Sequence, residues 1–145
     1  MPIEVDTREQ RPYGFAGREV DLVRTALFAG DYAVRGPTGI HAAVERKTGN
    51  DFVTSATSGA LAFSMADLSA LPAAAVVVED RYSALVAHSR VRPGFMAELI
   101  ARLQVRTPNV PIVYAETRTV AEDWTYRFLA TAWRELGGGL TSKGG

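Results

Sequence analysis

The chain has 145 residues with a formal net charge of zero, 47% hydrophobic and 22% charged residues, and no cysteine. This length and composition predict one soluble globular domain, and they exclude disulfides, thiolate metal sites and a strongly basic surface over the whole molecule. The sequence shows no signal peptide and no apolar run long enough to span a membrane. We therefore expect a cytoplasmic protein, associated with the nucleoid if its source is prokaryotic.

The first part of the chain predicts short strands separated by turns. Residues 7–17 combine Gly, Pro and polar side chains, which is typical of a loop. A second turn, around the GPTGI stretch at residues 36–40, joins two strands into a hairpin. The strands that we expect here cover residues 3–6, 20–27, 32–35 and 41–47.

The rest of the chain predicts alternating helices and strands. The continuous apolar run at residues 73–78 is typical of a strand covered on both faces. The last helix would begin with a capping box, Thr119 to Glu122, and end at Gly137, where a flexible tail over residues 137–145 follows. We expect a further strand at 111–115 and helices at 49–70, 82–88, 93–106 and 119–136. This order predicts an α/β fold, with a single domain built on a mixed β-sheet flanked by helices.

The predicted hairpin brings two acidic residues together. If residues 36–40 form the turn, Arg35 lies opposite His41. The same register places Asp31 opposite Glu45, with Cβ atoms about 5 Å apart. Two ionised carboxylates at this separation repel each other unless a cation lies between them. Because all the ligands are oxygens, the preferred ions are Mg²⁺ and Mn²⁺.

Two further charged residues follow Glu45 in the strand. Side chains alternate along a strand, so Glu45 and Lys47 share one face while Arg46 points to the other. Lys47 could orient an attacking hydroxide or neutralise charge that develops on a phosphate. An acid on one strand followed by Glu-x-Lys on the next is the pattern of metal-dependent nucleases with a PD-(D/E)xK core. On spacing alone, a cross-strand salt bridge is the simpler explanation.

Three motifs in order make the pattern more specific. VDTRE (5–9), GDY (30–32) and VERKTGND (44–51) resemble the nuclease domain of XPF-type structure-specific endonucleases, most closely the short prokaryotic and phage-type members. The resemblance implies a restriction-endonuclease-like nuclease domain over residues 1–136. It also implies a Mg²⁺- or Mn²⁺-dependent endonuclease that cuts branched or flapped DNA in repair or recombination.

The resemblance assigns roles to the matching positions. It makes Asp31 and Glu45 the principal metal ligands, completed by the backbone carbonyl of Arg46, and it makes Lys47 act on the water or the transition state.

Other matching positions surround this centre. By the resemblance, Asp6 and Glu9 line the site and reach the metal through water. Asp51 matches a further acid, although an acid near a helix start is also a good cap. Arg8 and Arg46 either contact DNA phosphate or pair with these acids.

A basic segment provides further candidate DNA contacts. Residues 81–118 contain six basic and two acidic side chains, a local net charge of +4. Arg90 and Arg92 lie in this segment and are predicted to contact the phosphate backbone. A solvated helical face is the alternative, and charge alone favours it.

The sequence also departs from the family. Ala60 stands where relatives often carry a basic residue that contacts phosphate, and the tandem helix-hairpin-helix domain of many relatives does not follow. We therefore expect a separate helix-hairpin-helix partner. We also expect DNA as a partner, and a homodimer or heterodimer formed through the helices, with Trp133 as a candidate interface residue. A catalytically inactive DNA-binding or dimerisation module is the alternative function. A structural α/β domain with salt bridges in its hairpin is the third.

Overall fold

The computed structural model describes residues 1–144, including the side chains of residues 1–136. Its strands are β1 (Pro2–Asp6), β2 (Asp21–Thr25), β3 (Tyr32–Gly36), β4 (Gly39–Thr48), β5 (Ala73–Glu79) and β6 (Ile112–Tyr114). Its helices are α1 (Gly49–Ser58), α2 (Ala60–Leu68), α3 (Tyr82–Val86), α4 (Phe95–Arg106) and α5 (Arg118–Gly144). Each predicted segment therefore contains an element of the expected type.

The strands form one mixed sheet in the order β2-β1-β3-β4-β5-β6. The pairs β1–β2, β4–β5 and β5–β6 are parallel, whereas β3 is antiparallel to both of its neighbours, β1 and β4. Because β3 runs against them, the carboxyl ends of β1 and β4 lie at the same edge of the sheet as the beginning of β3. The acids predicted from the sequence lie at this edge.

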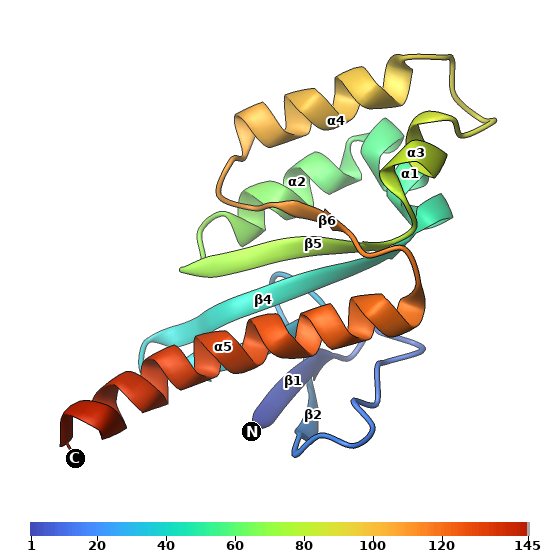
Figure 1. Ribbon diagram of the computed structural model, residues 1–145. Coiled ribbons are helices and arrows are strands. Elements are labelled where there is room, and N and C mark those ends of the chain that lie inside the picture. Colours follow the sequence, from blue (N-terminus) through green and yellow to red (C-terminus); the bar gives the residue numbers. More distant parts are fainter. Residues whose placement is uncertain (145) are drawn as a thin grey trace.

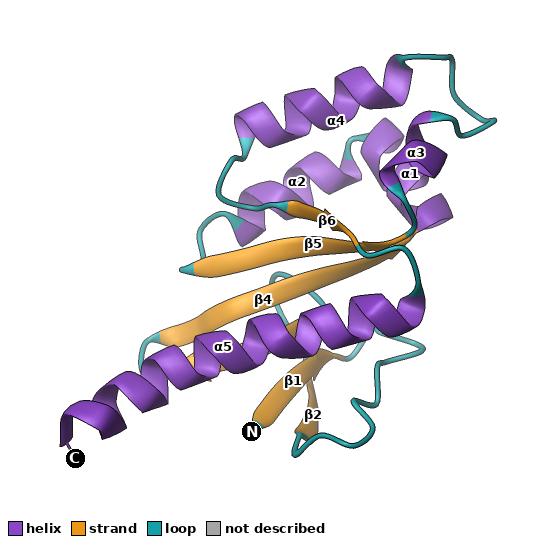
Figure 2. Cartoon of the chain, in the orientation of Figure 1, coloured by secondary structure: helices purple, strands orange, loops and turns teal. Residues whose placement is uncertain are grey.

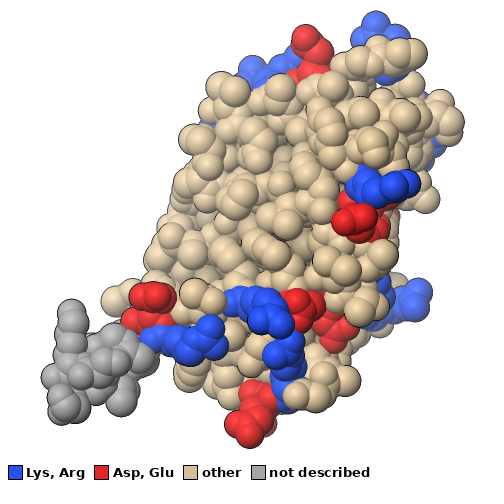
Figure 3. Space-filling model, viewed as in Figure 1, with Lys and Arg blue, Asp and Glu red and all other residues tan. Residues whose placement is uncertain are grey.

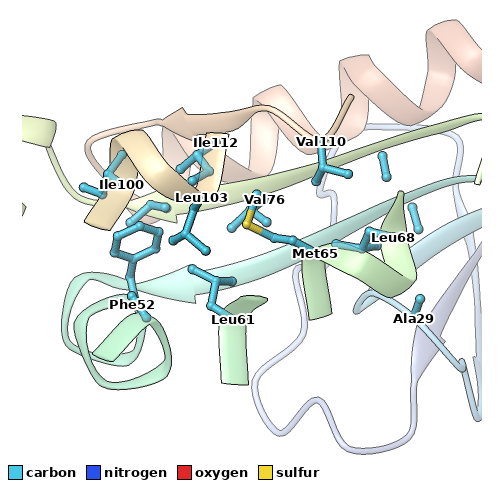
Figure 4. Close-up of a cluster of buried hydrophobic side chains, with 14 of the residues drawn as sticks. Ala29, Phe52, Leu61, Met65, Leu68, Val76, Ile100, Leu103, Val110 and Ile112 are labelled. Atoms are coloured by element: carbon cyan, nitrogen blue, oxygen red, sulfur yellow. The ribbon is translucent and has the colours of Figure 1, made fainter. Parts of the chain in front are cut away.

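Helices cover both faces of the sheet, with α5 across one face and α1, α2 and α4 on the other (Figures 1 and 2). Beneath α5, an apolar cluster includes Val5, Tyr32 and Leu129. The opposite cluster includes Phe52 and Met65, which pack against the sheet and α4 (Figure 4). The predicted α/β fold with a single mixed sheet is confirmed.

The β3–β4 hairpin turns at residues 37–38 and not over 36–40. Arg35 therefore pairs with Ile40, and the predicted pairing of Arg35 with His41 is wrong. Two-residue turns are favoured in hairpins because their twist matches that of the strands. A bulge then restores the predicted register, with the pairs Val34–Ala42, Ala33–Ala43 and Tyr32–Val44.

The predicted helical region at 49–70 consists of two helices that meet at Gly59. This residue has φ of +90°, a left-handed conformation that ends α1 and favours glycine. The hydroxyl of Thr48 caps α1 by accepting a hydrogen bond from the Asp51 N–H at 3.1 Å. The cap is therefore Thr48, and Asp51 lies in the first helical turn, where its charge complements the helix dipole.

Helix α5 differs from the prediction at both ends. Its cap is Thr117, whose hydroxyl accepts a hydrogen bond from the Val120 N–H at 3.2 Å, so the predicted capping box at Thr119 is wrong. The helix continues to Gly144, past the predicted end at Gly137, because glycine adopts helical dihedrals as well as the left-handed ones that end a helix. Residue 145 lies outside the described residues. None of the helices described here is long and apolar enough to cross a membrane.

The core-facing side of α5 does not include its pair of stacked aromatic rings. Ala121, Thr125 and Leu129 are fully buried against the sheet. Trp124 and Phe128 are only partly buried at the margin of this cluster, where their rings stack with centroids 4.9 Å apart. The small residues Ala121 and Thr125 thus face the core together with Leu129, and the two stacked rings lie beside them.

Candidate active site

A cavity of about 330 Å³ opens at the edge of the sheet where β1 and β4 end and β3 begins. Ligand sites in sheets with helices on both faces commonly lie beyond the carboxyl ends of the strands. The cavity is lined by Asp6, Arg8, Glu9, Phe28, Ala29, Gly30, Asp31, Glu45, Arg46, Lys47, Asp51, Ser64 and Asp67. The sequence motifs thus come together in space, and α2 contributes two lining residues that sequence reasoning did not identify.

Strand β4 sends its charged side chains to both faces of the sheet, as predicted. Ala43 belongs to the cluster under α1 and α2, and Val44 belongs to the cluster under α5. Alternation therefore directs Glu45 and Lys47 toward the α1–α2 side and Arg46 toward the α5 side. The Lys47 ammonium lies 3.2 Å from a Glu45 carboxylate oxygen, and both side chains are largely buried.

Asp31 is held in place by the backbone around it. Gly30 precedes it with φ of +80°, and a Cβ at Gly30 would lie 3.0 Å from the Cβ of Ala43, so this close approach to β4 requires glycine. The Asp31 N–H donates to the Val44 carbonyl at 2.8 Å. Its carboxylate Oδ2 accepts a hydrogen bond of 2.7 Å from the backbone N–H of Arg46. These contacts fix the carboxylate beside β4.

The surroundings of Asp31 favour its protonated form. Burial raises the pKa of this carboxyl to about 7, although the hydrogen bond from the Arg46 N–H opposes the rise. The negative charges of Glu45 and Glu9 raise the pKa further, and Lys47 acts in the opposite direction. A carboxylate that is costly to ionise beside other acids is a favourable position for a cation.

Asp6 lines the cavity, but its carboxylate already accepts hydrogen bonds from neighbouring residues. One carboxylate oxygen accepts hydrogen bonds from the Arg8 Nε at 2.7 Å and from the Arg8 N–H at 3.2 Å. The other accepts from the Leu27 N–H at 2.9 Å. Burial alone would raise the pKa of Asp6, but these hydrogen bonds outweigh it and hold the pKa below its usual value. Asp6 therefore anchors Arg8 and the loop before β3.

Arg46 joins three segments on the opposite face of the sheet. Its guanidinium lies 3.2 Å from Glu9 and 2.7 Å from Glu79, and it packs over the ring of Tyr13. The Tyr13 hydroxyl donates to Glu79 at 2.5 Å, and the Tyr13 ring stacks on Tyr32. The structure thus favours the predicted alternative in which Arg46 pairs with the acids. Of these partners, Glu79 could have been identified from the sequence, because it is an acid at the end of a buried strand. No sequence pattern in the loop indicates a role for Tyr13.

The remaining predicted residues divide between two locations. The side chain of Arg8 is 78% exposed at the rim of the cavity, and Asp51 lines the cavity from the first turn of α1. Arg90 and Arg92 instead line a second cavity of about 450 Å³ against α1. Arg90 donates to the Thr54 hydroxyl at 3.1 Å. These two arginines are therefore not part of the acidic site.

The acidic cavity has the ligand chemistry of a site for a hard divalent cation. Within residues 1–136, no three His, Cys, Asp or Glu side chains already converge closely enough to form a complete metal site. Asp31 and Glu45 nevertheless provide carboxylate oxygens in one cavity, and burial, together with the charges of Glu45 and Glu9, raises the pKa of Asp31. Mg²⁺ and Mn²⁺ suit such a set because they use one or two carboxylates together with water.

Comparison with known protein families matches the ERCC4 domain over residues 5–128, which include all three sequence motifs and every residue lining the acidic cavity. The chain belongs to the ERCC4 domain family. This is a family of nucleases that act on DNA. The predicted family is therefore confirmed, and so is the predicted restriction-endonuclease-like fold.

Solved structures agree with this assignment of the fold. XPF from Aeropyrum pernix in complex with DNA shares 22% identity at a TM-score of 0.69, over 92% of this chain and 66% of that chain. XPF from Aeropyrum pernix in a second structure also shares 22% identity, at a TM-score of 0.71, over 97% of this chain and 69% of that chain. The ERCC4 domain thus spans about two thirds of these relatives. A search of curated proteins finds no match.

Proposed function

We propose that this ERCC4 domain is a Mg²⁺- or Mn²⁺-dependent DNA endonuclease that cuts branched or flapped DNA in repair or recombination. The observation that carries the proposal is Asp31, whose partly buried carboxylate shares one cavity with Glu45 and Lys47. The membership of a nuclease family supports the same reaction. By the same reasoning we propose a cytoplasmic location close to its DNA substrate.

Each residue of the cavity has a specific part in this proposal. Asp31 and Glu45 hold the divalent ion, with the backbone carbonyl of Arg46 as a further ligand. When bound, such an ion supplies Lewis acidity, which promotes deprotonation of water and neutralises phosphate charge. The N–H of Arg46 keeps Asp31 oriented through the 2.7 Å hydrogen bond. The hydrogen bonds of Asp6 keep the loop before Asp31 in place.

Lys47 provides the positive charge that the reaction needs. In phosphodiester hydrolysis the water oxygen bonds to phosphorus, one P–O ester bond breaks, and the departing alkoxide takes up a proton. Negative charge grows on the phosphate oxygens before that bond is broken. The Lys47 ammonium, held 3.2 Å from Glu45, lies in the same cavity and stabilises this charge. Arg8 at the rim offers a second cation to the DNA backbone.

The proposal is tested by cleavage of fluorescently labelled flap, fork and duplex DNA in Mg²⁺, in Mn²⁺ and in EDTA. We expect cutting that requires metal and that falls by at least about 100-fold in Glu45→Gln, because removal of a metal ligand weakens both binding and catalysis. Asp21→Asn is the matched control, since Asp21 is exposed on the edge strand β2 and outside the cavity. Wild-type rates in Glu45→Gln would refute the proposed site.

A DNA-binding module without catalytic activity is the second candidate. The observation that favours it is charge, because the chain is neutral overall and both Arg8 and Arg46 are paired with acids. Such a module would bind DNA without cutting it and would show no rise in melting temperature with Mn²⁺. A metal-dependent rise that Asp31→Asn abolishes would favour the nuclease.

A further inference from the structure

Two exposed phenylalanines stand out from the rest of the aromatic residues. The chain has six phenylalanines, of which Phe15 and Phe52 are buried and Phe95 and Phe128 are partly buried. The remaining two, Phe28 and Phe63, have exposed fractions of 65% and 79%. Single exposed apolar residues are common on protein surfaces and need no explanation by themselves. These two, however, come from two segments that both contribute residues to the lining of the acidic cavity.

Phe28 lines the cavity from the loop between β2 and β3. The residue before it, Leu27, is fixed at both backbone groups: its N–H donates to Asp6 at 2.9 Å, and its carbonyl accepts from Arg8 at 3.2 Å. Two residues later Gly30 packs against β4. An exposed ring on a loop anchored on both sides keeps its position, so it can contact a ligand without first being ordered.

Phe63 belongs to α2, which forms another wall of the cavity. The core side of α2 is made by its buried residues Leu61, Met65 and Leu68, and Ser64 and Asp67 line the cavity. With 3.6 residues per turn, Phe63 lies one turn before Asp67 and about 40° from it around the helix axis. Its ring therefore projects into solvent beside Asp67, at the rim of the cavity.

The charge of the cavity explains why aromatic contacts would be needed there. Its lining contains six acids and three cations, and all three cations, Arg8, Arg46 and Lys47, are paired with acids. Such a surface repels a phosphate backbone wherever metal does not neutralise it. Stacking between a base and an aromatic ring contributes affinity without any charge, and it does not depend on the identity of the base.

We propose that Phe28 and Phe63 form a stacking platform for unpaired bases of the DNA strand that enters the acidic cavity. The inference rests on the proposed nuclease function, and it restricts the substrates of that nuclease to DNA with unpaired bases at the site. Bases in a duplex are stacked on their neighbours and are not free to stack on the protein, so the strand held here is single-stranded next to the cut. The exposed Arg8 at the same rim contacts the phosphates of this strand.

The test measures binding and cutting of a flap with normal bases and of the same flap with abasic nucleotides beside the cut. Binding is measured by fluorescence anisotropy in the Asp31→Asn background, so that no DNA is cut. For the normal flap, we expect Phe28→Ala and Phe63→Ala each to bind about tenfold more weakly. Phe28→Trp, which keeps an aromatic ring, should bind as tightly as the protein with Phe28. Val105→Ala is the matched control, because Val105 is equally exposed on α4 and lies outside the cavity.

The abasic flap separates stacking from structural damage. If the rings stack on bases, the abasic flap already binds weakly, and Phe28→Ala and Phe63→Ala lower its affinity no further. An equal loss on both flaps, or no loss on either, would overturn the platform, as would a protein that binds neither flap. Because binding is measured without cleavage, absence of cutting by the wild type refutes the nuclease alone. Normal cutting together with unchanged binding by the variants refutes the platform alone.

Discussion

The environment of Asp31 itself indicates the function of the site. Gly30, strand β4 and the backbone N–H of Arg46 place the Asp31 carboxylate among other acids. Like charges that are held close together in a folded protein are commonly found at sites where binding or catalysis requires them. The stability of the protein is therefore expected to depend on the ionisation of this residue.

We predict that the protein without metal loses stability between about pH 4 and pH 7. The folded pKa of Asp31 is raised to about 7 from 3.8, so the folded state binds a proton more tightly than the unfolded state, and this stabilisation is lost as pH rises. The loss is at most about 4 kcal/mol. Asp31→Asn should remove this pH dependence and raise the unfolding free energy at pH 8.

Urea denaturation of wild type and Asp31→Asn at pH 5 and pH 8, in EDTA, checks this prediction. Addition of Mn²⁺ at pH 8 should stabilise the wild type and leave the variant unchanged. A wild type that is more stable at pH 8 than at pH 5, with the variant less stable at both, would contradict it.

At the scale of elements, one ion-pair network joins the first loop to the centre of the sheet. Glu79 at the end of β5 accepts hydrogen bonds from Arg46 of β4 and from Tyr13 of the loop. Burial alone would raise the pKa of Glu79, but these two donors outweigh it and hold the pKa below its usual value. The network fixes the segment that carries Glu9 and supports the strand that orients Asp31.

We predict that Glu79→Gln lowers the unfolding free energy by about 1–3 kcal/mol, because it leaves a largely buried guanidinium with one ionic partner in place of two. Tyr13→Phe should cost a similar amount through the lost hydrogen bond to a charged group. Chemical denaturation at pH 7 measures both changes. Glu19→Gln, at an exposed position outside the network, is the control and should fall within about 0.5 kcal/mol of wild type.

At the scale of the whole molecule, the outer side of α5 is the surface to consider for the dimer that the sequence predicts. Figure 3 shows charged residues gathered around the lower part of this face, with a broad uncharged area above them. A groove there is lined by Ala73, Trp124, Phe128 and Ala132 together with the polar neighbours Arg127 and Thr131. Trp133, the residue expected at an interface, is partly buried against the sheet and offers less free surface.

We propose that this groove forms a homodimer interface, and we predict that Phe128→Glu converts the dimer to a monomer. A charge placed among apolar residues at the centre of an interface is costly to desolvate, whereas the same change at the exposed position Val105 should have no effect. Sedimentation velocity at micromolar concentration distinguishes the two species, and circular dichroism checks that both variants are folded. A wild type that sediments as a monomer would refute the interface.

Much of this organisation could be predicted from the sequence, because it depends on local patterns. Strand alternation correctly separated Glu45 and Lys47 from Arg46, and the hairpin brought Asp31 to β4 despite an error at the tip of the turn. The hydrogen bond between Tyr13 and Glu79 joins residues 66 positions apart, and no local pattern encodes it. The positions of α2 beside the cavity and of Arg90 away from it likewise depend on packing between distant segments.

The bulge in the β3–β4 hairpin has a consequence for how this family can vary in length. An inserted residue between the bulge and Lys47 would exchange the two faces of β4, turning the Arg46 side chain toward α1 and α2 and the Glu45 side chain toward Tyr13. Residues added at the 37–38 turn leave the register beyond the bulge unchanged. Evolution can therefore lengthen the tip of this hairpin freely, while the stretch from the bulge to the lysine must keep a constant number of residues.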